Sequence, residues 1–290
     1  MKVFNVFLLV LILVISGCSQ SSQEETVISP ALEQTETVVM PEESQSPTLI
    51  PLPTNTLIPE PEITPSPTIS SVVISSPLQD YSIDELVDMI SNLYNPPTPG
   101  SDDPHQGVDF SVVDPTMGYA TKGAAVQAIL SGNVVMVMND RFPYGNSLMI
   151  ETTFENLPSS WKDFMVELPS PDKFAVNPAL TCPEGWDQPQ NSDEALSLFI
   201  LYAHLADATE WEIGDQIESG EIVGLIGDSG NALAPHIHIE MRYGYSDSLK
   251  GSMAHYDVTA IEEEMSNYCR WRVSGWYRLV DPMALLLRDP

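Results

Sequence analysis

Four of the chain's five histidines lie beside residue types that bind metals or transfer protons. His236 and His238 are one residue apart in the segment APHIHIE, and His204 lies in the segment LYAHL. Side chains two positions apart on a strand point to the same face, so His236 and His238 would project in parallel. His105 is followed four residues later by Asp109 in the segment HQGVD. Imidazole and carboxylate groups in this pattern are candidates for a hydrolytic metal site.

A zinc site that hydrolyses bonds uses three protein ligands and keeps one position for water. His105, Asp109 and one histidine of the APHIHIE pair supply such a set. Water bound to zinc has a pKa of about 7, so no strong side-chain base is required. The two remaining histidines would transfer protons or stabilise an oxyanion. Each motif alone is weak, because single strand histidines are usually structural; together, in this order, they indicate a metal site.

The elements that would position these residues are short strands. Apolar or alternating runs are separated by turns rich in glycine and asparagine, which is typical of a mainly antiparallel β domain. The runs are residues 126–129, 134–138, 147–150, 198–202, 213–226 and 237–241. Within the run 198–202 and its continuation, the period of two predicts that Tyr202 and His204 share one face.

One helix and two insertions interrupt this pattern. Ser82 and Glu85 match a capping box, and apolar residues at helical spacing follow as far as Asn95, which predicts one short N-terminal helix within residues 78–104. Residues 155–197 and 244–274 lack the strand pattern. Loops of that length are uncommon in compact domains, so both are expected to be structured insertions into the domain 105–290.

In an exported protein, an even pair of cysteines favours a disulfide. Cys182 and Cys269 lie in different insertions, and a disulfide between them would join the two; two separate buried thiols are the alternative. Residues 1–18 contain Lys2, an apolar run too short to span a bilayer, and Ser-Gly before Cys18. This segment resembles a signal peptide with a lipobox, which implies cleavage before Cys18 and its lipidation. An ordinary signal peptide or an anchor helix is the alternative.

Composition separates a linker from the domain. Residues 19–77 are rich in Ser, Thr, Pro, Glu and Gln and hold ten of the chain's 25 prolines, so they are expected to form a disordered tether. The whole chain has 41 acidic residues against 11 Lys and Arg. A negative field of this kind repels phosphate backbones, so no nucleic-acid partner is expected.

The order of motifs resembles one known family. HQGVD, YGNSLMIE, LYAHL, the segment IGDQIESGEIVGLIGDSGNALAPHIHIE and a closing Asp281-Pro282 are similar to the lysostaphin-type peptidases. These LytM-like zinc metallopeptidases cut peptidoglycan peptides and belong to the duplicated hybrid motif family. The resemblance extends from His105 to about Leu287, and neither insertion is matched.

The resemblance implies a small antiparallel, barrel-like β domain with one Zn²⁺ at the floor of an open groove. It implies that His105, Asp109 and His238 are the metal ligands and that His204 and His236 are the catalytic pair. The expected activity is a zinc-dependent endopeptidase acting on peptidoglycan stem or cross-bridge peptides outside the cytoplasmic membrane, anchored there by its lipidated N-terminus. The sequence does not indicate an oligomeric state.

The sequence leaves alternatives open for the function and for several residues. Some relatives have lost the metal ligands and activate other wall hydrolases, and the long insertion 155–197 could block the groove, so a silent wall-binding module is the alternative function. Glu240 would either orient a ligand histidine or pair with Arg242. Tyr144 and the tryptophans are expected to pack in the interior, and His255 matches no motif.

Overall fold

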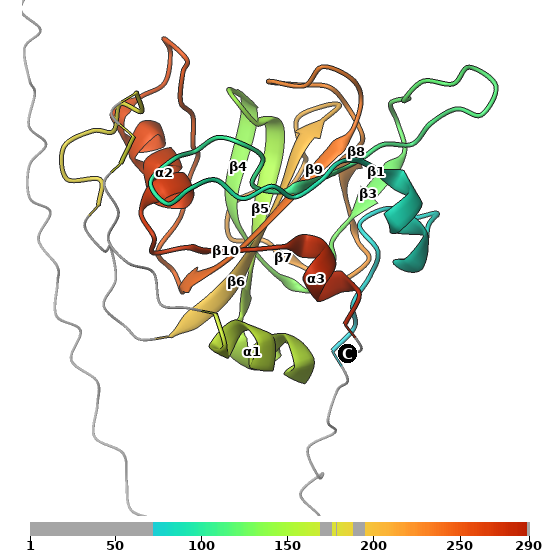
Figure 1. Cartoon of the computed structure of the whole chain (residues 1–290), viewed down its shortest axis with the longest axis horizontal. Coiled ribbons are helices and arrows are strands. Elements are labelled where there is room, and N and C mark those ends of the chain that lie inside the picture. The colour runs from blue at the N-terminus through green and yellow to red at the C-terminus, as the bar shows by residue number, and fades with distance from the viewer. Residues whose placement is uncertain (1–71, 169–175, 178, 188–194, 289–290) are drawn as a thin grey trace, which may run out of the picture. The chain divides into compact units, whose positions relative to one another are not determined.

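The computed structural model of the chain describes residues 72–168, 176–177, 179–187 and 195–288, all of which fall within one compact unit, Pro65–Pro290 (Figure 1). The predicted signal peptide with Cys18 and most of the predicted linker lie outside these residues. Among the described residues, no helix combines the length and the apolar character that crossing a bilayer requires.

An eight-stranded antiparallel sheet forms the centre of the domain, which confirms the predicted mainly β fold. Seven strands follow one path: β1 (Ile90–Asn92), β2 (Val108–Phe110), β9 (Ile237–Tyr245), β6 (Leu196–Leu205), β5 (Gly145–Thr153), β4 (Gly132–Arg141) and β7 (Gln216–Ile217). The eighth, β10 (Arg278–Val280), pairs with the second half of β9, whereas β2 pairs with its first half. A separate pair joins β3 (Ala125–Gln127) and β8 (Ile222–Leu225).

Both faces of the central strands are covered. The alternation in β9 sends Ile237, Ile239 and Met241 into one hydrophobic cluster. His238 and Glu240 point to the opposite face. That face is covered by a second cluster, in which Trp271 packs edge to face against Phe199 of β6, with ring centroids 6.5 Å apart. The site histidines therefore lie on a sheet face from which the second hydrophobic cluster partly excludes water.

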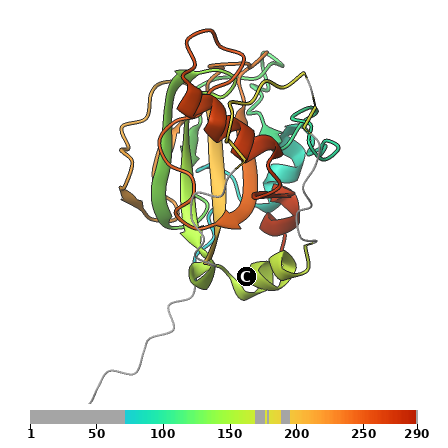
Figure 2. The same cartoon turned by 90° about the vertical axis from the view of Figure 1, so that its left-hand side faces the viewer.

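The two predicted insertions carry helices. The first contains the 3-10 helix η2 (Phe154–Asn156) and α1 (Ser159–Val166), and the second contains α2 (Glu262–Val273), which lies across one face of the sheet (Figure 2). Three glutamates begin α2 and two arginines end it, a distribution that favours a helix through its dipole. Cys182 and Cys269 form a disulfide, so the structure joins the two insertions.

The N-terminal segment differs from the prediction. The Ser82 backbone N–H donates to Glu85 Oε2 at 2.8 Å, which is half of the predicted capping box; the Glu85 N–H donates to the Ser82 carbonyl oxygen at 3.2 Å and not to the hydroxyl. However, only the short 3-10 helix η1 (Asp84–Met89) follows, and Ile90 begins strand β1. Pairing of Ile90 with Phe110 of β2 extends the sheet, and this long-range pairing outweighs the local helical pattern.

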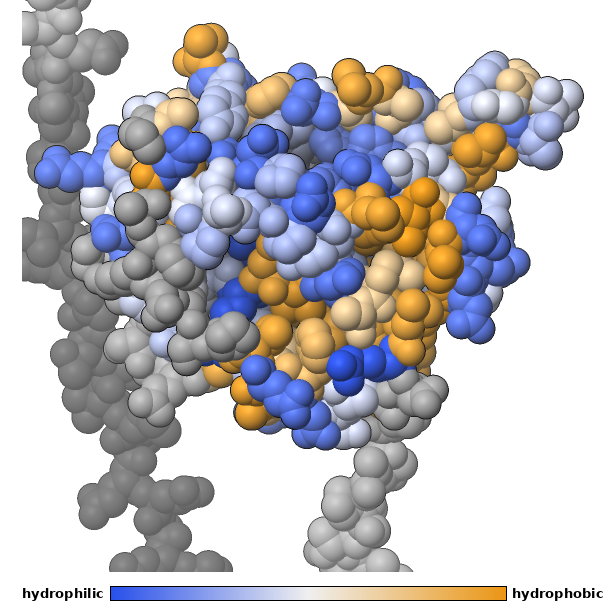
Figure 3. Space-filling view, in the orientation of Figure 1, coloured by the Kyte–Doolittle hydropathy of each residue, from blue (hydrophilic) through white to orange (hydrophobic). Residues whose placement is uncertain are grey.

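The C-terminal motif Asp281-Pro282 begins a short helix, α3 (Pro282–Leu286), in which the Asp281 side chain accepts a hydrogen bond from the Met283 N–H at 3.0 Å. Apolar residues gather on the surface near β10 and α3 (Figure 3). A cavity of about 300 Å³ on this side is lined by Tyr94, Leu168 and Leu279, among others.

Candidate metal centre

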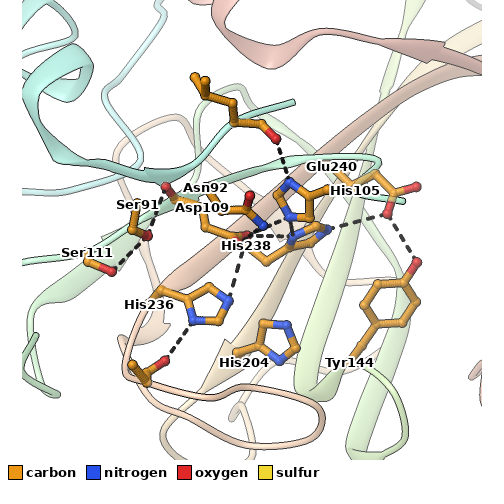
Figure 4. Close-up of polar contacts among 12 residues, drawn as sticks. Ser91, Asn92, His105, Asp109, Ser111, Tyr144, His204, His236, His238 and Glu240 are labelled. Atoms are coloured by element: carbon orange, nitrogen blue, oxygen red, sulfur yellow. Dashed lines mark hydrogen bonds and ion pairs between the residues drawn. The ribbon is translucent and has the colours of Figure 1, made fainter. Parts of the chain in front are cut away.

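Strand pairing places two of the predicted ligands side by side. Asp109 on β2 is the register partner of His238 on β9, so both side chains point to the same face. Asp109 Oδ1 lies 2.8 Å from His238 Nδ1. His105, in the loop before β2, brings its Nε2 to 3.0 Å from Asp109 Oδ1 and 3.1 Å from His238 Nδ1 (Figure 4).

The other polar atom of each side chain has its own partner. His105 Nδ1 lies 2.9 Å from the carbonyl oxygen of Leu93, to which it donates. Asp109 Oδ2 accepts from the Asn92 amide at 3.1 Å. His238 Nε2 makes a longer contact of 3.5 Å to Glu240 Oε2. These contacts orient both rings so that His105 Nε2 and His238 Nδ1 point toward Asp109 Oδ1.

This donor set fits zinc. Four ligand atoms at about 2.0–2.1 Å from a tetrahedral zinc lie roughly 3.3 Å from one another. The three atoms contributed by His105, Asp109 and His238 are 2.8–3.1 Å apart, within a few tenths of an ångström of that spacing. Two imidazoles and one carboxylate, each held by an outer hydrogen bond, are ligands that zinc accepts in hydrolytic sites.

His204 reaches the site by a route that the sequence pattern did not predict. Tyr202 points into the first hydrophobic cluster, where its hydroxyl accepts from the Ile129 N–H at 2.8 Å. The backbone at His204 has φ of +66°, a left-handed conformation rare for residues other than glycine, and the register with β5 shifts at this point. The predicted shared face of Tyr202 and His204 is therefore wrong, because this bulge turns His204 toward the histidine cluster.

His204 and His236 form a pair beside the ligand cluster. Their ring centroids are 4.7 Å apart, and His204 lies 5.8 Å from His238 by the same measure. Carbonyl oxygens fix both rings: that of Ser229 lies 2.8 Å from His204 Nδ1, and that of Ala234 lies 2.8 Å from His236 Nδ1. The Nε2 atom of each ring therefore remains available for proton transfer. His236 Nε2 lies 3.7 Å from Asp109 Oδ1.

The electrostatic environment shifts the pKa values of His204 and His238 in opposite directions. Burial, followed by the neighbouring His238 and His236, lowers the pKa of His204 to about 3, so this ring is neutral at pH 7. Burial alone would also lower the pKa of His238, but its bonds to Asp109 and Glu240 outweigh burial and raise it to about 9. Burial would raise the pKa of Asp109, but its hydrogen bonds with His105 and His238 outweigh burial and hold that pKa well below its usual range.

A buried ionic network lies behind His238. The Glu240 side chain is fully buried and bonds to Arg242 Nε at 2.7 Å, Arg272 Nη1 at 2.9 Å and the Tyr144 hydroxyl at 3.1 Å. Burial would raise the pKa of Glu240, but the charges of Arg272 and Arg242 outweigh it and keep the carboxylate ionised. Arg272 belongs to no motif, and Asn92 to none either; neither was identified from the sequence.

The site opens into a cleft of about 790 Å³ lined by the four histidines His105, His204, His236 and His238 together with Asp109. The second insertion supplies part of the wall through Tyr256 and Tyr268, whose hydroxyls donate to Asp102 Oδ2 at 2.8 and 3.0 Å. This insertion therefore lines the cleft and leaves its volume open.

Residues outside the metal centre occupy structural positions. His255 is buried, its Nε2 lies 2.7 Å from the Thr181 carbonyl oxygen, and its ring stacks on Tyr268. Trp161 and Trp271 are fully buried, whereas the other three tryptophans are partly buried against the two hydrophobic clusters. Tyr144 both packs in the second cluster and contacts the Glu240 carboxylate.

Solved structures with some likeness to this chain include three peptidases. The catalytic domain of the antimicrobial peptidase lysostaphin from Staphylococcus simulans is 18% identical, with 72% of this chain and 99% of that chain covered and a TM-score of 0.36. That of the prophage-encoded M23 protein EnpA from Enterococcus faecalis is 20% identical (56% and 85% covered, TM-score 0.32). A zinc-containing peptidase from Vibrio cholerae is 22% identical (52% and 32%, TM-score 0.29). No curated protein matches the chain.

The sequence pattern described as "Peptidase family M23" matches residues 192–250. This segment covers about a fifth of the chain and includes strands β6 to β9 with His204, His236 and His238. His105 and Asp109 lie outside it. Over residues 192–250 the chain is therefore similar to peptidase family M23, in agreement with the resemblance to the lysostaphin-type peptidases.

Proposed function

We propose that this protein is an extracytoplasmic zinc-dependent endopeptidase that hydrolyses peptide bonds in the stem or cross-bridge peptides of peptidoglycan. One observation carries the proposal. His105 and Asp109, which lie outside the matched family segment, have donor atoms within 3.1 Å of His238, which lies inside it. A chain that had lost the hydrolytic site would not be expected to keep three such donors, with a pair of histidines beside them, in one cleft.

His105, Asp109 and His238 would hold the metal. When bound, zinc supplies Lewis acidity toward a water molecule and a peptide carbonyl oxygen. His204 enters the reaction neutral, with its Nδ1 proton donated to Ser229, so its Nε2 can accept a proton from the attacking water. His236 Nε2 faces the same space and would share the transfer of that proton to the leaving amine.

The N-terminal residues support a proposal for where the enzyme acts. We propose that residues 1–18 direct export, that Cys18 is lipidated, and that the Pro-rich residues 19–77 tether the domain to the outer face of the cell membrane. Support comes from the apolar run followed by Ser-Gly-Cys and from the ten prolines between residues 19 and 77. Several acyl chains on one cysteine anchor a protein stably, because each buried methylene contributes about 0.8 kcal/mol.

Incubation of the intact protein with purified sacculi tests the activity. Mass spectrometry of the soluble fraction should find peptide fragments with new amino termini, and a chelator should abolish their release. Wall material from hosts with different cross-bridges would identify the bond. Stoichiometric zinc binding without any new amino groups, across several wall types, would instead favour the silent wall-binding module.

A further inference from the structure

The carboxylate of Glu240 uses its two oxygens differently. Oε1 accepts from Arg242 Nε at 2.7 Å, and Arg242 lies on the same strand, two residues later. Oε2 is the oxygen that faces His238 Nε2, at 3.5 Å. Thus Arg242 holds one side of the carboxylate, and the side that contacts the predicted metal ligand needs a partner from elsewhere.

Arg272 supplies that partner from the second insertion. Its Nη1 donates to Glu240 Oε2 at 2.9 Å and lies 3.0 Å from the Tyr144 hydroxyl, which also donates to Oε2, at 3.1 Å. The same oxygen is therefore shared by His238, Arg272 and Tyr144. A carboxylate oxygen fixed by two donors in the interior has little freedom to turn away from the imidazole.

Arg272 is itself held rigidly. Its Nη2 donates to the Asp102 carbonyl oxygen, and its guanidinium lies 6.0 Å from the ring centre of Tyr144 and 5.9 Å from that of Tyr268. It sits in the last turn of α2, three residues after Cys269, whose disulfide to Cys182 ties this helix to the first insertion. The position of Arg272 therefore depends on both insertions, each of which lies largely outside the family segment.

We propose that Arg272 is a positioning residue that orients the metal ligand His238 through Glu240, so that helix α2 of the insertion sets the metal affinity of the site. This inference rests on the metal centre proposed above and adds a role for the insertion. Outer hydrogen-bond partners of ligand histidines typically change metal affinity by about 10- to 100-fold when they are removed. We expect an effect of that size because Arg272 acts on the oxygen that His238 faces.

The test measures the zinc dissociation constant of the intact protein by competition with a chromophoric chelator. Arg272→Gln should weaken zinc binding by about tenfold or more. Arg272→Lys should recover part of the loss, because an ammonium can pair with Glu240 Oε2 but cannot also bind Tyr144 and Asp102 in the same geometry. In a Glu240→Gln background, Arg272→Gln should have a much smaller effect, since the coupling passes through Glu240.

Arg141→Gln is the matched control. Arg141 also anchors α2, through its Nε bond of 2.8 Å to Glu264 in the first turn, but it does not contact Glu240. This variant should lower the thermal midpoint while its zinc affinity stays at the wild-type value. Circular dichroism spectra would show which variants fold.

The outcomes separate this inference from the proposed function. A wild-type protein that binds no zinc would overturn the metal centre itself. Tight binding by the wild type together with equal binding by Arg272→Gln would overturn only the role of Arg272. The role of Arg272 would also be overturned if Arg272→Gln and Arg141→Gln lost equal amounts of zinc affinity. If Arg272→Gln does not fold, full wild-type zinc affinity in Arg272→Lys would overturn it as well. If neither Arg272 variant folds, Arg272 is a residue of the core and the inference is wrong.

Discussion

Asp109 Oδ1 lies 2.8 Å from His238 Nδ1 across a pair of antiparallel strands whose register sets the two residues opposite each other. The same Asp109 oxygen lies 3.0 Å from His105 Nε2. One carboxylate oxygen thus contacts both imidazoles at the centre of the proposed site. Its other oxygen is fixed by Asn92 at 3.1 Å.

Because Asp109 joins the donor set, Asp109→Asn should abolish both zinc binding and peptide hydrolysis. An amide keeps the shape of the side chain but supplies a neutral and much weaker ligand. The loss of zinc affinity should exceed the roughly 10- to 100-fold effects of outer hydrogen-bond partners. Zinc content after dialysis and fragment release from sacculi measure the two effects. Asp88→Asn, at an exposed position outside the cleft, is the control; retained zinc in Asp109→Asn would contradict the ligand assignment.

His204→Ala should separate binding from catalysis. The ligand atoms come from other residues, so zinc affinity should remain close to that of the wild type. Turnover should fall by roughly 10²- to 10⁴-fold, the usual contribution of a positioned proton-transfer group. His255→Gln removes another buried histidine, which contacts Thr181 outside the cleft, and should affect stability without this loss of turnover. Full activity of His204→Ala would show that the residue has no such role.

Zinc binding should release about one proton near neutral pH. The pKa of His238 in the metal-free protein is raised to about 9, above its ordinary value of 6.5, so the ring is protonated at pH 7 and must lose that proton to bind a metal. Apparent zinc affinity should therefore rise with pH, by up to about tenfold per unit, and level off above pH 9. Calorimetry in buffers of different ionisation enthalpy counts the protons; none released would contradict this.

The raised pKa of His238 also determines how the stability of the metal-free protein depends on pH. A folded-state pKa above the unfolded value stabilises the metal-free protein fully below pH 6.5, and this stabilisation is lost as pH rises through about 9. The contribution of His238 should therefore make the metal-free protein unfold at a lower denaturant concentration at pH 9.5 than at pH 6.

The sequence predicted those parts of the site that depend on local pattern. The alternation His-Ile-His-Ile indicated a polar face on β9, and His105 and Asp109 were identified as candidate ligands, although strand β2, which carries Asp109, was not among the predicted runs. Local pattern failed where long-range contacts decide. Ile90 pairs with Phe110 and ends the predicted helix, and the bulge at His204 reverses the alternation at a residue that is not glycine. Arg272 meets Glu240 only because α2 folds over the sheet, which no spacing in the sequence encodes.

Gly107, the glycine in HQGVD, lies against the β9 backbone and the His238 ring. A Cβ added to Gly107 would lie 2.4 Å from the Ile239 carbonyl oxygen and 2.7 Å from His238 Cε1, distances that real Cβ atoms essentially never show. Gly107→Ala should therefore push the β9 backbone and the His238 ring apart from β2 and weaken zinc binding more than it lowers the thermal midpoint. Gly224→Ala, whose nearest neighbour is the flexible Leu205 side chain at 3.1 Å, is the control and should bind zinc normally. Equal zinc affinity in the two variants would mean that the close approach of Gly107 to His238 does not constrain the metal centre.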